Sequence, residues 1–170
     1  SQIQLQKPFD AVVSERRTYP ITEDEPEEKH TYLSYNKVVG TVLDRELYQA
    51  FSILDYVLVS APGAPVRQAL IDAGIGEDVY GSFEDGMLQP MFSIVAKNAD
   101  ESDQTRFVQI IEETLQKLVK EGLNQDSLLA GINSAEFRFR EADYGQFPKG
   151  LLYGLQCMDC LLYTSPSPRD

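Results

Sequence analysis

The chain has 170 residues, of which 42% are hydrophobic, and it carries 15 Lys and Arg against 27 Asp and Glu, a formal net charge of -12. This length and hydrophobic fraction suit one globular domain with a sizeable core. So acidic a chain is a poor candidate for binding nucleic acid or an anionic membrane surface, because both attract basic side chains. We therefore expect neither nucleic-acid nor membrane partners.

Targeting signals and cysteines favour a cytoplasmic location. No apolar run is long enough to cross a bilayer, and the first residues, SQIQLQKPFD, lack the basic-then-apolar order of a signal peptide. The two cysteines do not suggest a disulfide framework, so a reducing compartment is the simpler interpretation. Because the chain does not begin with Met, we also expect it to continue upstream.

The first part of the chain predicts two strands. Residues 9–19 alternate as a strand does, and residues 30–40 (HTYLSYNKVVG) carry apolar side chains on both faces, as a central strand would. Between them, residues 21–29 (ITEDEPEEK) are predicted to be a solvated turn. A bound cation is the alternative for this acidic run, although the ligand spacing of a calcium-binding loop is absent.

A helical hairpin is predicted next. Asp44 is placed to cap the first helix, and residues 61–63 (APG) end it. Pro65 begins a second helix, because a missing N–H costs little in the first turn. Gly74 and Gly76 end it, since glycine turns left-handed at low cost. The inner face of the first helix is predicted from four residues at helical spacing: Leu47, Phe51, Leu54 and Leu58.

The middle of the chain predicts a turn followed by a strand. Residues 77–89 contain several turn signals, among them Asp85-Gly86, which favours a tight hairpin turn. Residues 87–97 alternate like a strand and carry Pro90 near their beginning, where the missing backbone donor matters least.

The last part of the chain predicts three helices. The first carries Phe107 and Ile111 on its inner stripe and closes at Gly122. Asn124 caps the second, which spans about residues 125–142, and the third begins near residue 148. Together the elements predict an α+β fold, with a mainly antiparallel sheet and helices packed on one face.

Two stretches resemble a known family. They are residues 54–99 (LDYVLVSAPGAPVRQALIDAGIGEDVYGSFEDGMLQPMFSIVAKNA) and residues 136–159 (EFRFREADYGQFPKGLLYGLQCMD). Both are similar to the second domain of the insulinase/pitrilysin-type zinc metallopeptidases, in the presequence-protease branch. The resemblance implies that residues 1–159 are this non-catalytic domain, truncated at both ends, with the same layered fold. Residues 160–170 (CLLYTSPSPRD) depart from the pattern and resemble translated sequencing-adapter DNA, so we expect an artefactual tail.

The resemblance also implies a function. The chain would be part of a zinc-dependent metalloendopeptidase that degrades short unfolded peptides in an enclosed chamber, and this segment would form chamber wall and domain-packing surface. The expected partners are an upstream catalytic domain, a downstream C-terminal half and peptide substrates. The alternative is a scaffold or binding subunit of the same fold that lacks a zinc site.

No catalytic, cofactor-binding or metal-binding residue is assigned to this segment. The family binds zinc through a helical His-x-x-Glu-His motif, whereas His30 is the only histidine in this chain. The resemblance therefore implies that the zinc ligands of the full-length parent lie upstream and that the segment alone is inactive. His30 itself could be a general base, but a solvated histidine at a strand edge is the plainer interpretation.

Three further motifs have both a functional and a structural interpretation. Cys157-x-x-Cys160 could be a redox or metal pair, although no second pair is present. The glycines Gly74, Gly76 and Gly81 do not fit the dinucleotide fingerprint and are predicted to reverse the chain. A charged cluster could hold acidic groups of a peptide or form ion pairs on a helix surface; it consists of Arg138, Arg140, Glu141 and Asp143. Residues 147–150 (FPKG) could be a hinge or a helix start.

Overall fold

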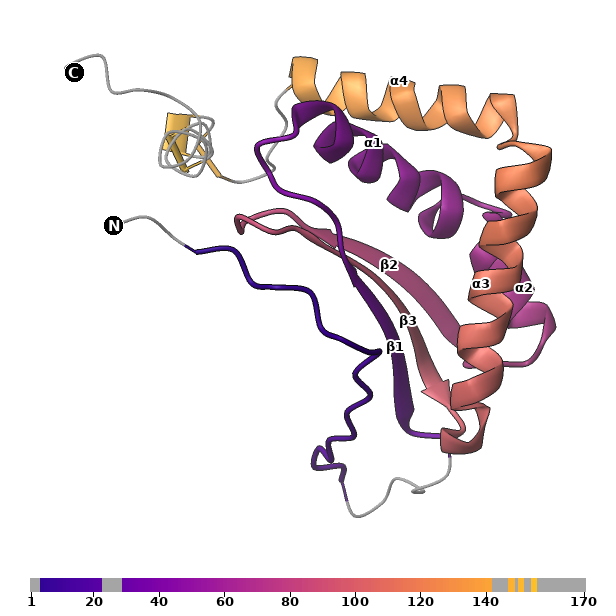
Figure 1. Ribbon diagram of the computed structural model, residues 1–170. Helices are drawn as coiled ribbons and strands as arrows, with labels where there is room; N and C mark the ends of the chain where they lie inside the picture. The colour runs from indigo at the N-terminus through magenta and orange to yellow at the C-terminus, as the bar shows by residue number, and fades with distance from the viewer. Residues whose placement is uncertain (1–3, 23–28, 142–146, 149, 152–153, 156–170) are drawn as a thin grey trace.

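The computed structural model describes residues 4–22, 29–141, 147–148, 150–151 and 154–155, and these residues form an α+β fold (Figure 1). Three antiparallel strands make an open sheet, and the helices gather on one of its faces. The predicted fold class is therefore confirmed. Within the part of the chain beyond residue 141, residues 150–151 and 154–155 are helical; the rest of the third predicted helix, both cysteines and the tail lie outside the described residues.

The sheet consists of β1 (Thr31–Val38), β2 (Asp78–Glu84) and β3 (Met91–Ala99), in the order β1-β3-β2. The prediction that residues 30–40 form a central strand is wrong, because β3 is the central strand and β1 lies at an edge. The sequence favoured β1 because both of its faces carry apolar residues, but Tyr32 and Val38 lie exposed on the outer face. The most continuously buried strand is β3, as expected for a strand with two neighbours.

The prediction of a turn over residues 77–89 is wrong for residues 78–84, which form β2. Residues 78–84 pair with β3 in a regular antiparallel register that runs from Asp78 opposite Lys97 to Glu84 opposite Met91. Residues 85–90 connect the two strands, so Asp85-Gly86 lies in a longer loop rather than in a tight two-residue turn. Residues 78–84 contain turn-favouring residues, which is why the sequence predicted a turn. Pairing with the buried strand β3 outweighs this local preference and makes the segment a strand.

The predicted helical hairpin is present. Its first helix, α1 (Arg45–Asp55), begins at Asp44, whose Oδ1 accepts the Leu47 N–H at 3.0 Å as predicted. The helix continues as the π-helix η1 (Tyr56–Ser60), whose wider turn the sequence did not indicate. After the elbow, α2 (Pro65–Asp72) begins at the predicted proline.

Three helical elements follow the sheet in the described residues up to Glu141. The short 3-10 helix η2 (Glu101–Asp103) leads into α3 (Gln104–Glu121), which ends at Gly122 as predicted. Next comes α4 (Gln125–Glu141), where the Asn124 Oδ1 accepts the Ser127 N–H at 2.9 Å, so Asn124 is the predicted cap. The apolar surface predicted for α4 is only partly used, because Leu129 and Phe137 are exposed.

The core lies between the sheet and the helices. It is contributed by β3, the helical hairpin and α3, and its largest fully buried side chains are Phe107, Leu70, Ile75, Ile94 and Ile111. The inner stripe predicted for α3 therefore does face the core, and Phe51, Leu54 and Leu58 of the predicted first helix contact it.

Residues 9–19, predicted to be a strand, form none in the structure. The segment runs past β1 (Figure 1), but no backbone hydrogen bond joins these residues to that strand. An extended segment becomes a strand only through such backbone bonds. The side chains of residues 9–19 are exposed. The segment alternates as a strand does, but it has no neighbouring strand to pair with, and the prediction failed for that reason.

Candidate functional site

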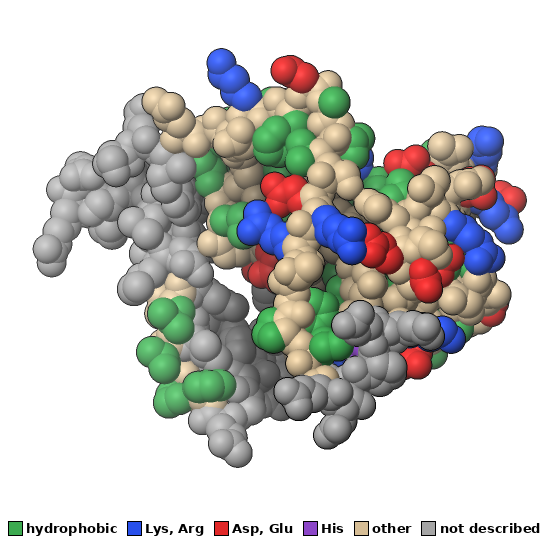
Figure 2. All heavy atoms as spheres, turned by 90° about the horizontal axis from the view of Figure 1, so that it is seen from below, with side chains coloured by type: hydrophobic (Ala, Val, Ile, Leu, Met, Phe, Trp, Pro, Cys, Tyr) green, Lys and Arg blue, Asp and Glu red, His purple; other side chains and the backbone are tan. Residues whose placement is uncertain are grey.

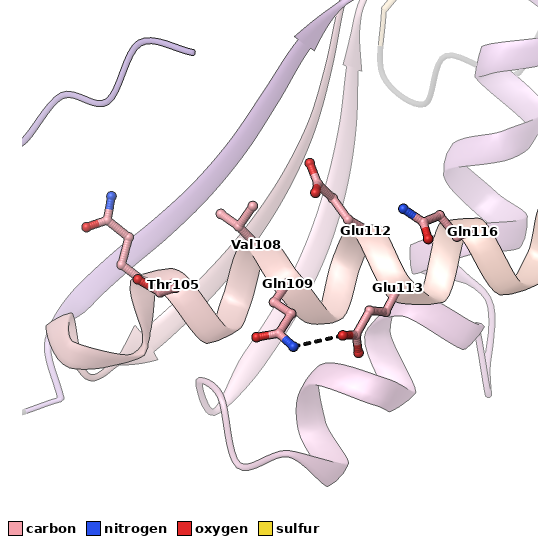
Figure 3. Close-up of a pocket in the computed structure, with 7 residues that line it drawn as sticks. Thr105, Val108, Gln109, Glu112, Glu113 and Gln116 are labelled. Carbon is pink, nitrogen blue, oxygen red and sulfur yellow. Dashed lines mark hydrogen bonds between the residues drawn. The ribbon is translucent and has the colours of Figure 1, made fainter. Parts of the chain in front are cut away.

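A shallow groove of about 690 Å³ runs along α3. Figure 3 shows the labelled side chains in a row on this one helix, with the Gln109 amide donating to the Glu113 carboxylate at 2.8 Å. A catalytic or binding pocket normally has polar groups that converge from several elements. Here all the described lining residues come from α3: Gln104, Thr105, Val108, Gln109, Glu112, Glu113 and Gln116. The groove is therefore a polar helix face and not a site with assembled chemistry.

A second hollow of about 310 Å³ lies beside α2. Its one basic side chain among the described lining residues, Arg67, is already bound to the Asp78 carboxylate at 3.0 Å. This ion pair joins α2 to the start of β2, so its role is to hold the helical hairpin on the sheet.

The residues present do not fit a zinc centre. His30 is the only histidine of the chain, and it lies just before β1, half-buried. Its backbone carbonyl accepts the Tyr19 hydroxyl. No group of three or more His, Cys, Asp or Glu side chains that could hold a metal ion occurs among the described residues. No catalytic step can therefore be built on a metal held by the residues that the structure describes.

Gly74 and Gly76 reverse the chain as predicted, but the prediction is wrong for Gly81, which lies within β2. Gly74 and Gly76 both have φ of +73°, a left-handed conformation that favours glycine. The Glu77 N–H donates to the Lys97 carbonyl at 2.8 Å, so the turn brings the start of β2 directly against the end of β3. Gly76 is also confined sterically, because a Cβ there would lie 2.8 Å from the Lys97 carbonyl oxygen.

One close-packed cluster was not recognised from the sequence. Asp55 ends α1 and its Oδ2 accepts the Ser60 hydroxyl at 3.2 Å, across the π-helical turn. A Cβ on Gly81 of β2 would lie 2.1 Å from Asp55 Oδ1 and 3.2 Å from Val59 Cβ. The bare backbone of Gly81 thus lets the end of α1 lie directly on the sheet. A lone glycine inside a strand often marks such a close approach, which was the available signal.

The charged cluster predicted near residue 140 is only partly described. Arg140 pairs with the Glu136 carboxylate one helical turn earlier, which agrees with an ion pair on the helix surface. The side chains of Arg138, Glu141 and Asp143 lie outside the described residues. Acidic and basic side chains also alternate on the face seen in Figure 2, so the described charges there form no patch of a single sign.

Two titratable groups have shifted pKa values, and both shifts come from local hydrogen bonds. The Ser102 hydroxyl and backbone N–H donate to Asp100 Oδ1 at 2.6 and 2.8 Å and lower the pKa of the Asp100 carboxyl. The hydrogen bond from Arg17 to Glu15, assisted by their opposite charges, raises the pKa of the Arg17 guanidinium. Both groups are fully exposed, so they stabilise local turns and are not poised for proton transfer.

Comparison of the sequence with known proteins assigns the chain to a peptidase family. The family model described as "Peptidase M16 inactive domain" matches residues 2–134, and the chain therefore belongs to this family. A curated relative, Protein HypA of Clostridium perfringens, is 40% identical over 163 residues, which are 96% of this chain and 17% of the relative. Presequence protease 1 of Arabidopsis thaliana, named as chloroplastic/mitochondrial, is 33% identical over 165 residues, which are 96% of this chain and 15% of the relative.

A solved structure shares the fold. The inactive peptidase domain of a protein assigned as a zinc protease in Bordetella parapertussis superposes with a TM-score of 0.65. The two are 14% identical, and the match covers 79% of this chain and 70% of that domain. The predicted insulinase-type, presequence-protease-like family is thus confirmed. The chain spans less than a fifth of the length of the two curated relatives, at 17% and 15%.

The structure also bears on the predicted location. None of the described helices is long and apolar enough to cross a membrane. The cytoplasmic location stays a prediction, and the Arabidopsis relative is named for two organelles.

Proposed function

We propose that this chain is the non-catalytic second domain, or most of it, of a zinc-dependent metalloendopeptidase that degrades short unfolded peptides. The observation that carries this proposal is the family match over residues 2–134, combined with the single histidine of the chain. A two-histidine zinc centre cannot be assembled from His30 alone. The zinc ligands and the water-activating carboxylate would come from an upstream catalytic domain of the same parent protein.

In this proposal the segment contributes a packing surface and part of the wall of an enclosed chamber. The exposed apolar side chains of α4 support a packing role, since Leu129 is 57% and Phe137 is 62% exposed. Large apolar side chains grouped on one exposed helix commonly mark an interface. The excess of acidic residues would favour basic peptides, mostly through short-range contacts because salt screens distant charges.

The test begins with the complete gene. We expect an upstream His-x-x-Glu-His in the same reading frame and coding sequence that continues past Asp159. The full-length protein should cleave short unstructured peptides, lose this activity with a chelator and regain it with zinc. The segment alone should cleave nothing. A full-length gene without the paired histidines would refute the catalytic proposal and leave the scaffold or binding function.

The packing role has its own test in the full-length protein. Leu129→Lys should weaken the contact between domains and make the protein more sensitive to limited proteolysis between them. Val119→Lys is the matched control, because Val119 is an equally apolar side chain that is 86% exposed on α3. Equal behaviour of the two variants would show that α4 is not the packing surface.

A further inference from the structure

We propose that residues 9–19 are a strap that closes onto the free edge of β1 as a fourth, antiparallel strand, and that contacts with the start of α3 hold it open in the conformation seen here. This proposal is independent of the zinc-peptidase function. It concerns a conformational change inside the described part of the chain.

The strap already runs along β1 in the required direction. At one end, the Tyr19 ring packs edge-on against the Tyr32 ring with centroids 5.6 Å apart. At the other end, the Gln6 N–H donates to the Gln89 side-chain oxygen at 2.7 Å, and Gln89 lies just before β3, near the end of β1. Tyr19 therefore lies near the beginning of β1 and Gln6 near its end, which is the antiparallel direction.

The side chains of the strap already alternate as those of a strand do. Ser14 and Arg16 reach the helix side, where Ser14 Oγ accepts the Gln104 amide at 2.9 Å and Arg16 meets Glu101 at 2.8 Å. Tyr19 instead contacts Tyr32, which lies on the opposite face of the sheet from the core residue Leu33. The even-numbered and odd-numbered side chains thus point to the two faces that a strand at this edge would have.

The edge of β1 is ready to accept a strand. The Val39 N–H donates to the Pro90 carbonyl at 2.8 Å, so the odd-numbered residues of β1 direct their backbone groups at β3. By alternation, the backbone groups of Ser34, Asn36 and Val38 point away from the sheet, toward the strap. An edge of this kind is a liability in water unless something covers it.

The contact between Tyr19 and Tyr32 sets the register of the closed strap. If these two residues lie opposite each other, Val13 falls opposite Val38 on the same face. Val13 is 57% and Val38 is 59% exposed in the structure, so closure would bring two exposed apolar side chains together. Pro8 and Pro20 bound the strap, and neither has a backbone donor that a longer strand would need.

The contacts with α3 act as a latch that opposes closure. Glu101 and Gln104 lie just beyond Ala99, which pairs with Thr31 at the beginning of β1. In the closed register Arg16 and Ser14 would instead lie opposite Tyr35 and Lys37, farther along the strand. At about 3.3 Å per residue, Ser14 would then lie some 16 Å along β1 from Tyr19. The Arg16–Glu101 pair must therefore stretch or break before the strap can close.

Disulfide trapping tests the register in the full chain, with Cys157 and Cys160 replaced by Ser. Val13→Cys with Val38→Cys should form an intrachain disulfide under mild oxidation, because residues opposite each other in a ladder meet the required Cα separation. The control is Val12→Cys with Val38→Cys, whose side chains would point to opposite faces. We expect the first pair to close at least about tenfold faster, since mismatched side-chain directions prevent the bond. Equal rates would overturn the proposed register.

Hydrogen exchange tests the latch without introduced cysteines. Glu101→Gln should slow exchange of the Ser34, Asn36 and Val38 amides by favouring the closed strap. Glu112→Gln is the control, because Glu112 is exposed on α3 and makes no hydrogen bond or ion pair with residues 9–19. Unchanged exchange in Glu101→Gln would overturn the latch, as would equal slowing in both variants.

Discussion

Gly74 and Gly76 allow the cost of a backbone conformation to be separated from the cost of a steric contact. Both have φ of +73°, and both follow α2 in the turn that leads to β2. A Cβ on Gly74 would meet nothing within 4 Å. A Cβ on Gly76 would lie 2.8 Å from the Lys97 carbonyl oxygen and 3.2 Å from the Ala96 Cβ.

These distances determine the expected magnitudes. A left-handed conformation costs an L-residue about 1–2 kcal/mol, so Gly74→Ala should lower the free energy of unfolding by about that amount. Gly76→Ala should cost the same plus about 1–3 kcal/mol for overpacking, a total of about 2–5 kcal/mol. The clash at Gly76 cannot be relieved by rotating a side chain. The obstructing oxygen belongs to the backbone of β3 and accepts the Glu77 N–H at 2.8 Å.

Urea unfolding followed by circular dichroism measures both variants. We expect the midpoint to fall further for Gly76→Ala than for Gly74→Ala, with the same dependence on denaturant for both. Thermal midpoints should fall by about 2–4 °C for each kcal/mol in a chain of this size. Equal losses in the two variants would show that the turn yields around Lys97, and the steric argument would fail.

Three further predictions concern single side chains. Leu70→Ala should destabilise the fold by about 2–5 kcal/mol, because Leu70 is 0% exposed in the core. The control Ile71→Ala, on the exposed side of α2, should cost well under half of that. Chemical denaturation measures the free energy of unfolding of both variants. Asp44→Ala should cost about 0.5–2 kcal/mol by removing the cap of α1, and Asp44→Asn should retain most of the stability in the same assay. The hydrogen bonds from Ser102 lower the pKa of Asp100 in the folded chain, so their stabilisation is fully present above the ordinary carboxyl pKa of about 3.9 and is lost as the pH falls through the lowered value. An NMR titration of Asp100 should show this lowered pKa, and a titration with the ordinary midpoint would contradict it.

Local rules were sufficient for the helices. The cap at Asp44, the proline that begins α2 and the glycine that ends α3 are each specified by one side chain or by its absence. The inner face of α3 was equally predictable, since apolar residues at helical spacing can bury only one face. These features depend on residues that are close together in the sequence, so they can be predicted from the sequence without knowing the tertiary structure.

For the candidate site, the sequence predicted the missing zinc centre but not the close packing of side chains. The sequence predicts an absence, because one histidine cannot make a two-histidine zinc centre. The close packing of Asp55 on Gly81 could not be predicted from spacing, because it joins residues brought together only when α1 lies on β2. The lone glycine in the strand indicated a close approach but not which side chain would approach it.

The sequence by itself determined where α1, α2 and α4 begin, where α3 ends and the α+β class, because capping and amphipathic spacing act over a few residues; it did not indicate the π-helical turn η1. Only the tertiary structure decided which strands pair. Residues 78–84 became a strand against their turn signals because they lie beside the buried strand β3. Residues 30–40 took an edge position despite apolar side chains on both faces, and residues 9–19 remained unpaired despite strand-like alternation. A strand is stabilised by hydrogen bonds to a neighbour that is distant in sequence, and one-dimensional alternation does not identify that neighbour.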